Sequence, residues 1–385
     1  MMINRVSSFI LCLFVLLCGC TKSGANNSNL DNTDDVSSIP LEKRVGMLFM
    51  IRAESLDRSI PLDQVNARYE YGVTKVSSEM KKCYRSYPAG GICVFLKNID
   101  NPTQLHKFVN DFRSLNPNIL FSIDEEGGRI SRIAENPKFD VPHFEPMLTL
   151  TEGKTPDEAA AIGQNVGQKI GKYLKEYGFD IDFAPVADVN TNPNNIVIGN
   201  RAFGSDPTIA ACAVSGVLAG LAENGIVGCL KHFPGHGDTT GDTHEGYVRT
   251  DKTCEQLANC EMIPFRAGIQ AGAKMVMTAH IAVPNVTGEE QLPSTLSGTI
   301  LQDKLRGELG FDGVIVSDAM SMGAIHNEYS SGEAAVKAFL AGCDILLMPF
   351  DYIEAYQTVL EAVKNGTISE SRLNESVKRI MKLKK

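Results

Sequence analysis

The chain of 385 residues is 43% hydrophobic and 22% charged, an ordinary balance for a soluble globular protein. Its 37 Lys and Arg against 46 Asp and Glu give a formal net charge of −9, which excludes the basic footprint of a general nucleic-acid binder. The length alone allows either several domains or one large one.

The first residues differ in composition from the rest of the chain. The apolar run 9–17 is too short to span a bilayer and suits the hydrophobic part of a signal peptide. It ends in a Cys18-Gly19-Cys20 stretch that resembles the bacterial lipoprotein cleavage box. We therefore predict a signal over 1–19, a lipidated Cys20 and a flexible tether over 20–39, rich in Ser, Asn and Asp. An ordinary secretory signal is the alternative.

Short, mostly β-branched apolar runs alternate with helical patterns from residue 40 to 385. The runs are nearly continuous, as in strands buried on both faces of a parallel sheet. The predicted strands cover 45–50, 91–95, 119–123, 181–184, 228–232, 274–280, 314–318 and 344–348.

Helix signals stand between these runs. Thr155 and Glu158 have the spacing of a capping box, and Asp206-Pro207 begins a second helix that ends near Gly225. The alternation predicts a single α/β domain, a (β/α)₈ TIM barrel, with a doubly wound open sheet as the alternative. Further helices are predicted near 104–113, 255–271, 298–309, 332–341, 352–364 and 369–383.

Ionisable side chains follow five of the predicted strands, at the end where a barrel carries its chemistry. Several also suit structural roles: Asp124 and Glu126 as helix caps, and His280 as a buried histidine. Asp318 is harder to explain in this way, because a carboxylate directly after Val-Ile-Val-Ser enters the barrel mouth, where an unpaired charge is costly.

The segment 231–244 carries three histidines and two aspartates on a loop rich in Gly and Pro. The spacing of His232, His236 and His244 matches no common zinc signature, so we predict no metal and no other cofactor. Asp242 and His244 instead form a compact dyad. A carboxylate that orients an imidazole makes a group able to give and take a proton near neutral pH.

Seven cysteines follow residue 40. Cys93, Cys229 and Cys343 lie in apolar runs and are expected to be buried. Bridges between Cys254 and Cys260 or between Cys83 and Cys93 remain open, although the odd number leaves at least one thiol free.

These residues together resemble glycoside hydrolase family 3, specifically its single-barrel β-N-acetylhexosaminidase branch. The matching stretches run in order from residue 90 to 324, and the most specific are KHFPGHGDTTGDTH (231–244) and SDAMSM (317–322). The resemblance implies a retaining mechanism, with Asp318 as the nucleophile and His244, oriented by Asp242, as the acid and base. It also implies that the hydroxyls of the terminal sugar are held by Asp124, Arg132, Arg201, Lys231 and His232.

The implied substrate is a terminal β-linked N-acetylglucosamine of peptidoglycan fragments or chitooligosaccharides. The expected partners are this amino-sugar glycan and the envelope membrane, reached through the lipid alone, and the protein is expected to be a monomer that binds no nucleic acid. The alternatives are a β-glucosidase of the wider family and a surface lipoprotein that binds wall glycans without cleaving them. Phosphate in place of water as the acceptor also stays open.

Overall fold

The structure, a computed structural model, describes residues 35–67 and 72–384. The predicted signal peptide (1–19), Cys20 and most of the predicted tether therefore lie outside the described residues. The chain divides into two units, 1–35 and 36–385, and the second is the unit described below. Its first residues, Val36–Ser38, form a 3₁₀ turn with Val36 buried in the core, so this unit includes the last residues of the predicted tether.

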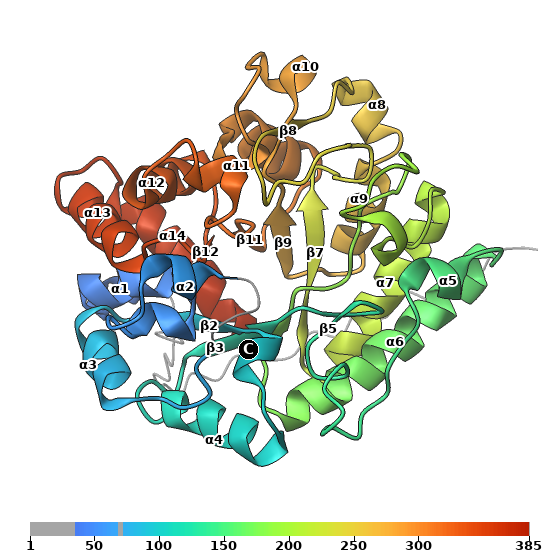
Figure 1. Ribbon diagram of the computed structural model, residues 1–385. Helices are drawn as coiled ribbons and strands as arrows, with labels where there is room; N and C mark the ends of the chain where they lie inside the picture. Colours follow the sequence, from blue (N-terminus) through green and yellow to red (C-terminus); the bar gives the residue numbers. More distant parts are fainter. Residues whose placement is uncertain (1–34, 68–71, 385) are drawn as a thin grey trace, which may run out of the picture. The chain divides into compact units, whose positions relative to one another are not determined.

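Eight parallel strands form the central sheet of this unit (Figure 1). They are neighbours in the same order in which they occur along the chain, and β1 also pairs with β12. A bridge between Val316 and Ile345 joins the two remaining edges. The sheet is therefore a closed barrel, which confirms the predicted fold. It is not the doubly wound open sheet that was the alternative. Its strands are β1 (Phe49–Arg52), β2 (Gly91–Val94), β3 (Leu120–Ile123), β6 (Ile181–Asp182), β7 (Val227–Phe233), β9 (Met275–Thr278), β11 (Val314–Val316) and β12 (Leu346–Leu347).

Helices follow the strands and surround the barrel (Figure 1). The predicted capping box is present at the start of α6, where the side chains and backbones of Thr155 and Glu158 bond reciprocally. The principal helices are α1 (Leu41–Met47), α3 (Ser78–Ser86), α4 (Pro102–Arg113), α6 (Pro156–Glu176), α7 (Pro207–Glu223), α8 (Cys254–Ala258), α9 (Met262–Gln270), the π-helix η6 (Thr299–Glu308), α12 (Ser331–Ala341), α13 (Tyr352–Lys364) and α14 (Glu370–Met381).

Shorter strands and helices lie in the loops between these elements. An antiparallel pair follows β3, and a parallel pair joins the segments that follow β7 and β9. These elements are β4 (Glu125–Gly127), β5 (Ile130–Ser131), β8 (Val248–Arg249) and β10 (Ile281–Ala282), with the short helices α2 (Leu62–Asn66), α5 (Met147–Thr151), α10 (Pro284–Thr287) and α11 (Gly323–His326).

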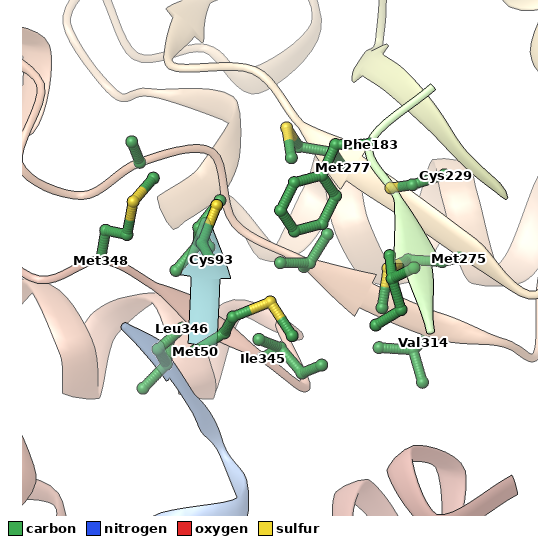
Figure 2. Packing of buried hydrophobic residues seen from close by; sticks show 14 of the residues in the cluster. Met50, Cys93, Phe183, Cys229, Met275, Met277, Val314, Ile345, Leu346 and Met348 are labelled. Atoms are coloured by element: carbon green, nitrogen blue, oxygen red, sulfur yellow. The ribbon is translucent and has the colours of Figure 1, made fainter. Parts of the chain in front are cut away.

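The interior of the barrel is filled by side chains rather than open. Sulfur-containing residues supply much of this packing (Figure 2), and those named next are at most 3% exposed. Methionine suits such a site because its flexible thioether fills irregular gaps between strands. The residues are Met50, Cys93, Cys229, Met275 and Met277.

Two expectations about the elements were wrong, and some helices were not predicted. The strand predicted at 45–50 begins only at Phe49, because Val45 belongs to α1, which was not predicted. The helix predicted over 255–271 is two helices, α8 and α9, with a break at residues 259–261. Helix α3 was missed, although Ser77 caps it.

Among the described residues, no helix combines the length and apolar character needed to cross a membrane.

Candidate active site

A cavity of about 710 Å³ opens at the carboxyl ends of the barrel strands. This is the end of the barrel where the sequence places the chemistry. Each of the eight strands supplies a lining residue from its own length or from just beyond its carboxyl end, and these residues are Arg52, Phe95, Asp124, Phe183, Lys231, Met277, Asp318 and Leu347.

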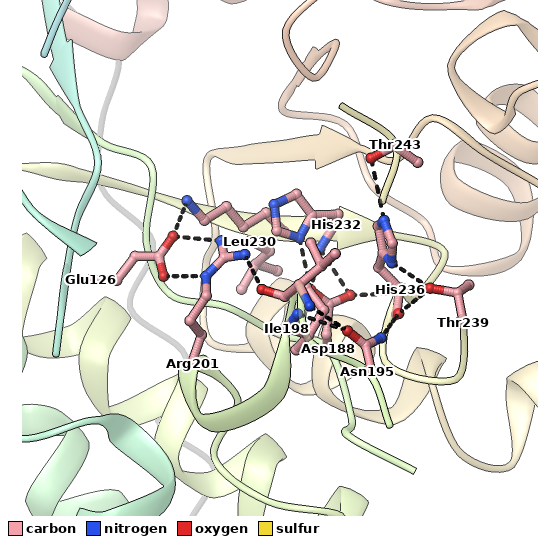
Figure 3. A network of polar contacts seen from close by, with 12 residues as sticks. Glu126, Asp188, Asn195, Ile198, Arg201, Leu230, His232, His236, Thr239 and Thr243 are labelled. Carbon is pink, nitrogen blue, oxygen red and sulfur yellow. Dashed lines mark hydrogen bonds and ion pairs between the residues drawn. The ribbon is translucent and has the colours of Figure 1, made fainter. Parts of the chain in front are cut away.

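A cluster of buried charges forms one side of the cavity (Figure 3). Glu126 accepts hydrogen bonds from Nε and Nη2 of Arg201, both at 2.8 Å, and its Oε1 lies 2.5 Å from Nζ of Lys231. Lys231 also donates to Oδ1 of Asp124 at 2.7 Å. Burial alone would raise the pKa of the Glu126 carboxyl, but the two cations outweigh burial and hold that pKa well below its usual range. Both cations are therefore fixed in place before any ligand arrives.

Asp188 organises the neighbouring histidines (Figure 3). Its Oδ2 lies 2.7 Å from Nδ1 of His232, and its Oδ1 accepts the backbone N–H of His236 at 2.6 Å. Burial would raise the pKa of Asp188, but His232 lowers it on balance. Because Nδ1 of His232 is engaged by Asp188, Nε2 is the ring nitrogen left to face the cavity that His232 lines.

Asp318 is half-buried at the cavity wall, two residues beyond β11. Its Oδ1 accepts the backbone N–H of Ala319 at 2.7 Å. Burial would raise the pKa of Asp318, but His232, His280 and this N–H lower it on balance, so the carboxylate is ionised at neutral pH. His280 is hydrogen-bonded at both ring nitrogens, to Thr295 and to the carbonyl of Ala319, which is the structural role considered for it from the sequence.

The predicted dyad of His244 and Asp242 is formed. Oδ1 of Asp242 lies 2.7 Å from Nδ1 of His244 and also accepts the backbone N–H of His244 at 2.9 Å. The His244 side chain is 45% exposed and lines the same cavity as Asp318. With Nδ1 held by the carboxylate, Nε2 is the nitrogen that can exchange a proton with a bound molecule.

All the predicted substrate-binding residues line this one cavity, as do Asp318 and His244, the residues predicted to react. Asp242 does not line it but is bonded to His244. Sequence reasoning gave no role in the site to Arg52, Glu126 or Asp188. The residues around Glu126 form no helix, and a short hairpin of β4 and β5 follows β3. The capping role that was considered as an alternative for Asp124 and Glu126 is therefore not formed. In the sequence, the run of three acidic residues at 124–126 was the signal that could have indicated the charge cluster around Glu126.

The described residues contain no group of three or more His, Cys, Asp or Glu side chains arranged to hold a metal ion. The absence of a metal or another cofactor from the enzyme stays a prediction. The seven cysteines in this part of the chain are all free, so neither of the two bridges left open is formed. Cys93, Cys229 and Cys343 are buried as predicted.

The family model for the glycosyl hydrolase family 3 N terminal domain matches residues 41–383. The chain belongs to glycosyl hydrolase family 3. This confirms the predicted family and the predicted class of enzyme, a glycoside hydrolase. The curated relatives of this chain include proteins named β-hexosaminidases. Beta-hexosaminidase A of Pseudoalteromonas piscicida is 33% identical over 338 residues, 81% of this chain and 56% of that protein. The β-hexosaminidase of Chromobacterium violaceum is 34% identical over 275 residues, 70% of this chain and 75% of that protein.

Solved structures of family 3 share the fold. A β-N-acetylglucosaminidase from Paenibacillus sp. str. FPU-7 superimposes with a TM-score of 0.79 and 34% identity, over 90% of this chain and 62% of that one. A family 3 member from Mycobacterium smegmatis has a TM-score of 0.74 and 27% identity, over 91% of this chain and 99% of that one. The chain therefore spans little more than half of the Pseudoalteromonas relative but nearly the whole of the mycobacterial protein.

Proposed function

We propose that this family 3 chain is a retaining exo-β-N-acetylhexosaminidase, which removes terminal β-linked N-acetylglucosamine from peptidoglycan fragments or chitooligosaccharides. The observation that carries the proposal is the meeting of Asp318 with the His244–Asp242 dyad at one cavity lined by fixed hydroxyl-binding groups. The names of the curated β-hexosaminidases and of the Paenibacillus β-N-acetylglucosaminidase support the choice of sugar.

In the first step Asp318 attacks the anomeric carbon and forms a covalent glycosyl-enzyme. Its Oδ1 is held by the N–H of Ala319, which leaves Oδ2 to form the new bond. As the bond from carbon to the leaving oxygen breaks, His244 donates the proton that the leaving oxygen takes up. The lowered pKa of Asp318 supports this role, because the nucleophile must be ionised.

In the second step His244 takes a proton from water, the water oxygen bonds to the anomeric carbon, and the bond to Asp318 breaks. Two displacements at one carbon return the original configuration. Asp242 holds His244 in the tautomer that presents Nε2, so that the same nitrogen serves both steps.

The sugar-binding side of the cavity suits a ring with vicinal hydroxyl groups. Asp124 and Lys231 form an ion pair at the wall, and Arg201 is fixed by Glu126. Carboxylate and guanidinium groups bind neighbouring hydroxyls in pairs, and groups already held in place lose little entropy on binding. Arg132 and His232 complete the proposed set, and both line the cavity.

The decisive experiment compares hydrolysis of an aryl β-N-acetylglucosaminide with that of the matching aryl β-glucoside, in phosphate buffer and in a phosphate-free buffer. We expect cleavage of the N-acetylglucosaminide, with free N-acetylglucosamine first released as the β-anomer in both buffers. Activity on the glucoside alone would favour a β-glucosidase, and a sugar 1-phosphate as the product would favour phosphorolysis. No cleavage of either substrate would favour the non-catalytic binding protein.

Two variants separate the proposed roles. Asp318→Ala should abolish turnover on every substrate, because no other group replaces the nucleophile. His244→Ala should slow cleavage of a poor leaving group by about 100-fold or more and spare the first step for a dinitrophenyl leaving group, which departs without a proton. Equal loss on both substrates would contradict the acid role of His244.

We also propose that Cys20 carries a lipid that anchors the protein in the bacterial cell envelope. The proposal rests on the sequence of the leader, with an ordinary secretory signal as the alternative. Cys20→Ser should move the protein expressed in bacteria from the membrane fraction to the soluble fraction and abolish labelling by a fatty-acid analogue. An unchanged distribution would exclude the lipid anchor.

A further inference from the structure

The segment that follows the nucleophile is hydrogen-bonded to the loop that carries the acid/base histidine. The backbone N–H of Gly323 donates to the carbonyl oxygen of His244 at 3.0 Å, and that of Ala324 donates to the carbonyl of Thr243 at 3.1 Å. Asn327 adds a third bond from its side-chain amide to the carbonyl of Glu245, at 3.3 Å. These three bonds join α11 and its C-cap, residues 323–327, to residues 243–245.

The bonds from α11 matter because the two bonds between Asp242 and His244 orient the ring within its own loop. Both bonds to Asp242 come from a residue two positions away in the chain. They fix the ring relative to residues 242–244, whereas Asp318 lies beyond β11 in a different part of the chain. The bonds from α11 connect the two reacting residues through a short stretch of backbone.

Gly323 allows this close approach. A Cβ atom at this position would lie 2.7 Å from both the carbonyl carbon and oxygen of Glu245 and 2.8 Å from the carbonyl oxygen of His244. Cβ atoms essentially never approach other atoms this closely, and carbonyl groups cannot swing away as the end of a flexible side chain can. The glycine is not needed for its own backbone conformation, because it lies within α11, where alanine would otherwise be favoured. The His244 loop can lie this close to α11 only because residue 323 has no side chain.

We propose that Gly323 is a positioning residue for His244: by admitting the carbonyls of residues 244 and 245 against α11, it sets the distance from the acid/base to Asp318. The inference rests on the proposed function and deepens it. An alanine at this position pushes the His244 loop away from the nucleophile while Asp318 and the sugar-binding side keep their places. A misplacement of about 1 Å is enough to cost about 100-fold in rate.

The test compares Gly323→Ala with Gly246→Ala, a matched control on the same loop. Gly246 has no atom within 4 Å of its would-be Cβ, and its φ angle is not in the left-handed region. Both variants are assayed in the full-length protein with a dinitrophenyl and an alkyl β-N-acetylglucosaminide, and their melting temperatures are measured. The double variant His244→Ala/Gly323→Ala is assayed beside His244→Ala.

We expect Gly323→Ala to lose about 10- to 100-fold in kcat/KM on the alkyl glycoside and to stay within about threefold of wild type on the dinitrophenyl glycoside, since only the alkoxide needs the proton. Azide, which needs no general base, should raise turnover of the dinitrophenyl substrate in Gly323→Ala but not in wild type. Gly246→Ala should match wild type. The double variant should be no slower than His244→Ala, because the histidine that Gly323 positions is already gone.

Equal loss on the two substrates, wild-type rates on both, or additive effects in the double variant would overturn the inference while leaving the proposed function intact. If Gly323→Ala does not fold, Asn327→Ala removes the third bond from an exposed position and should shift the ratio of the two rates in the same direction. An unchanged ratio in that variant would overturn the inference. A wild-type protein inactive on both substrates would instead overturn the proposed function, and the inference with it.

Discussion

At the scale of single residues, Glu126 sets the geometry of the proposed sugar-binding side. Its carboxylate is buried and contacts both Arg201 and Lys231. A buried charge is tolerated only when it is paired, and here the pairing also fixes two cations that face the cavity. Removal of Glu126 therefore affects both stability and the position of these two groups.

The free energy of unfolding measured at acid pH tests this pairing directly. The Glu126 pKa is lowered in the folded protein, so its ionised form contributes stability above the unfolded value of about 4.3, and this contribution is lost as the pH falls through the folded pKa. Glu126→Gln should cost about 3 to 5 kcal/mol at pH 7, because it leaves two buried cations short of a partner. Below pH 4.3 the difference from wild type should shrink by about 1.4 kcal/mol per pH unit.

Urea unfolding at several pH values measures the two stability curves. Glu152→Gln, at an exposed position, serves as the control and should follow wild type closely. A difference between wild type and Glu126→Gln that stays constant from pH 7 to pH 3 would contradict the assignment of the lowered pKa to Glu126.

Residue types at strand ends, together with the family resemblance, were enough to predict several residues of the cavity but not how they pair. Asp318 and Lys231 stand at or just after buried strands, and a barrel brings such positions together whatever their separation in the chain. Which carboxylate meets which cation depends on side-chain directions across neighbouring strands, and no local pattern encodes this. For that reason the roles of Glu126 and Asp188 were found only in the structure.

At the scale of elements, α6 and α7 owe their close contact to glycines. Cβ atoms at Gly163 and Gly167 of α6 would lie 2.2 Å and 2.3 Å from carbonyl oxygens of α7, and those at Gly216 and Gly220 would meet α6 at the same two distances. Because side chains at the contact set how closely two helices pack, the four glycines bring these backbones together.

Gly167→Ala should therefore destabilise the protein by about 1 to 3 kcal/mol, although alanine is the better helix former. Gly307→Ala is the matched control, because its Cβ would meet only the carbonyl of Gln302, at 3.4 Å in ordinary contact. The control should be neutral or should gain up to about 1 kcal/mol, since it removes backbone entropy from the unfolded chain. Chemical denaturation measures both; equal effects of the two substitutions would contradict close packing as the cause.

The elements that the sequence predicted well are those with local signals. Helix α6 has its capping box and α7 its Asp206-Pro207 start, and both begin where predicted. Strand β1 was placed too early because Val45 and Met47 belong to a short helix whose apolar residues read as a continuation of the strand. Periodicity over so few residues does not distinguish the two.

At the scale of the whole molecule, the Asp344 side chain links β11, at the place where the barrel closes, to α14, the last α-helix. Its Oδ2 accepts the N–H of Ile315 in the facing strand at 3.0 Å and Nη2 of Arg306 at 2.7 Å. Its Oδ1 accepts the hydroxyl of Ser376 in α14 at 2.5 Å, and Arg372 and Arg379 of the same helix lie within 3.4 Å of that oxygen. The Asp344 side chain is fully buried among these groups.

Asp344→Asn should lower the free energy of unfolding by about 3 to 5 kcal/mol, because three guanidinium groups then face a neutral amide. Asp303→Asn, at an exposed position on η6, is the control and should change the stability by less than about 0.5 kcal/mol. Urea denaturation followed by circular dichroism measures both. A loss of less than about 1 kcal/mol for Asp344→Asn would show that the backbone bonds alone close the barrel.

The free thiols of the described residues make this fold independent of redox conditions. No disulfide joins any two of the described residues, so the packing of the core requires no oxidant. Burial raises the pKa of the Cys93 thiol to about 12 and also raises that of Cys229 and Cys343, which leaves almost no thiolate to react. The barrel can therefore fold without disulfide formation on either side of a membrane. Reducing agents should leave the melting temperature of the protein unchanged.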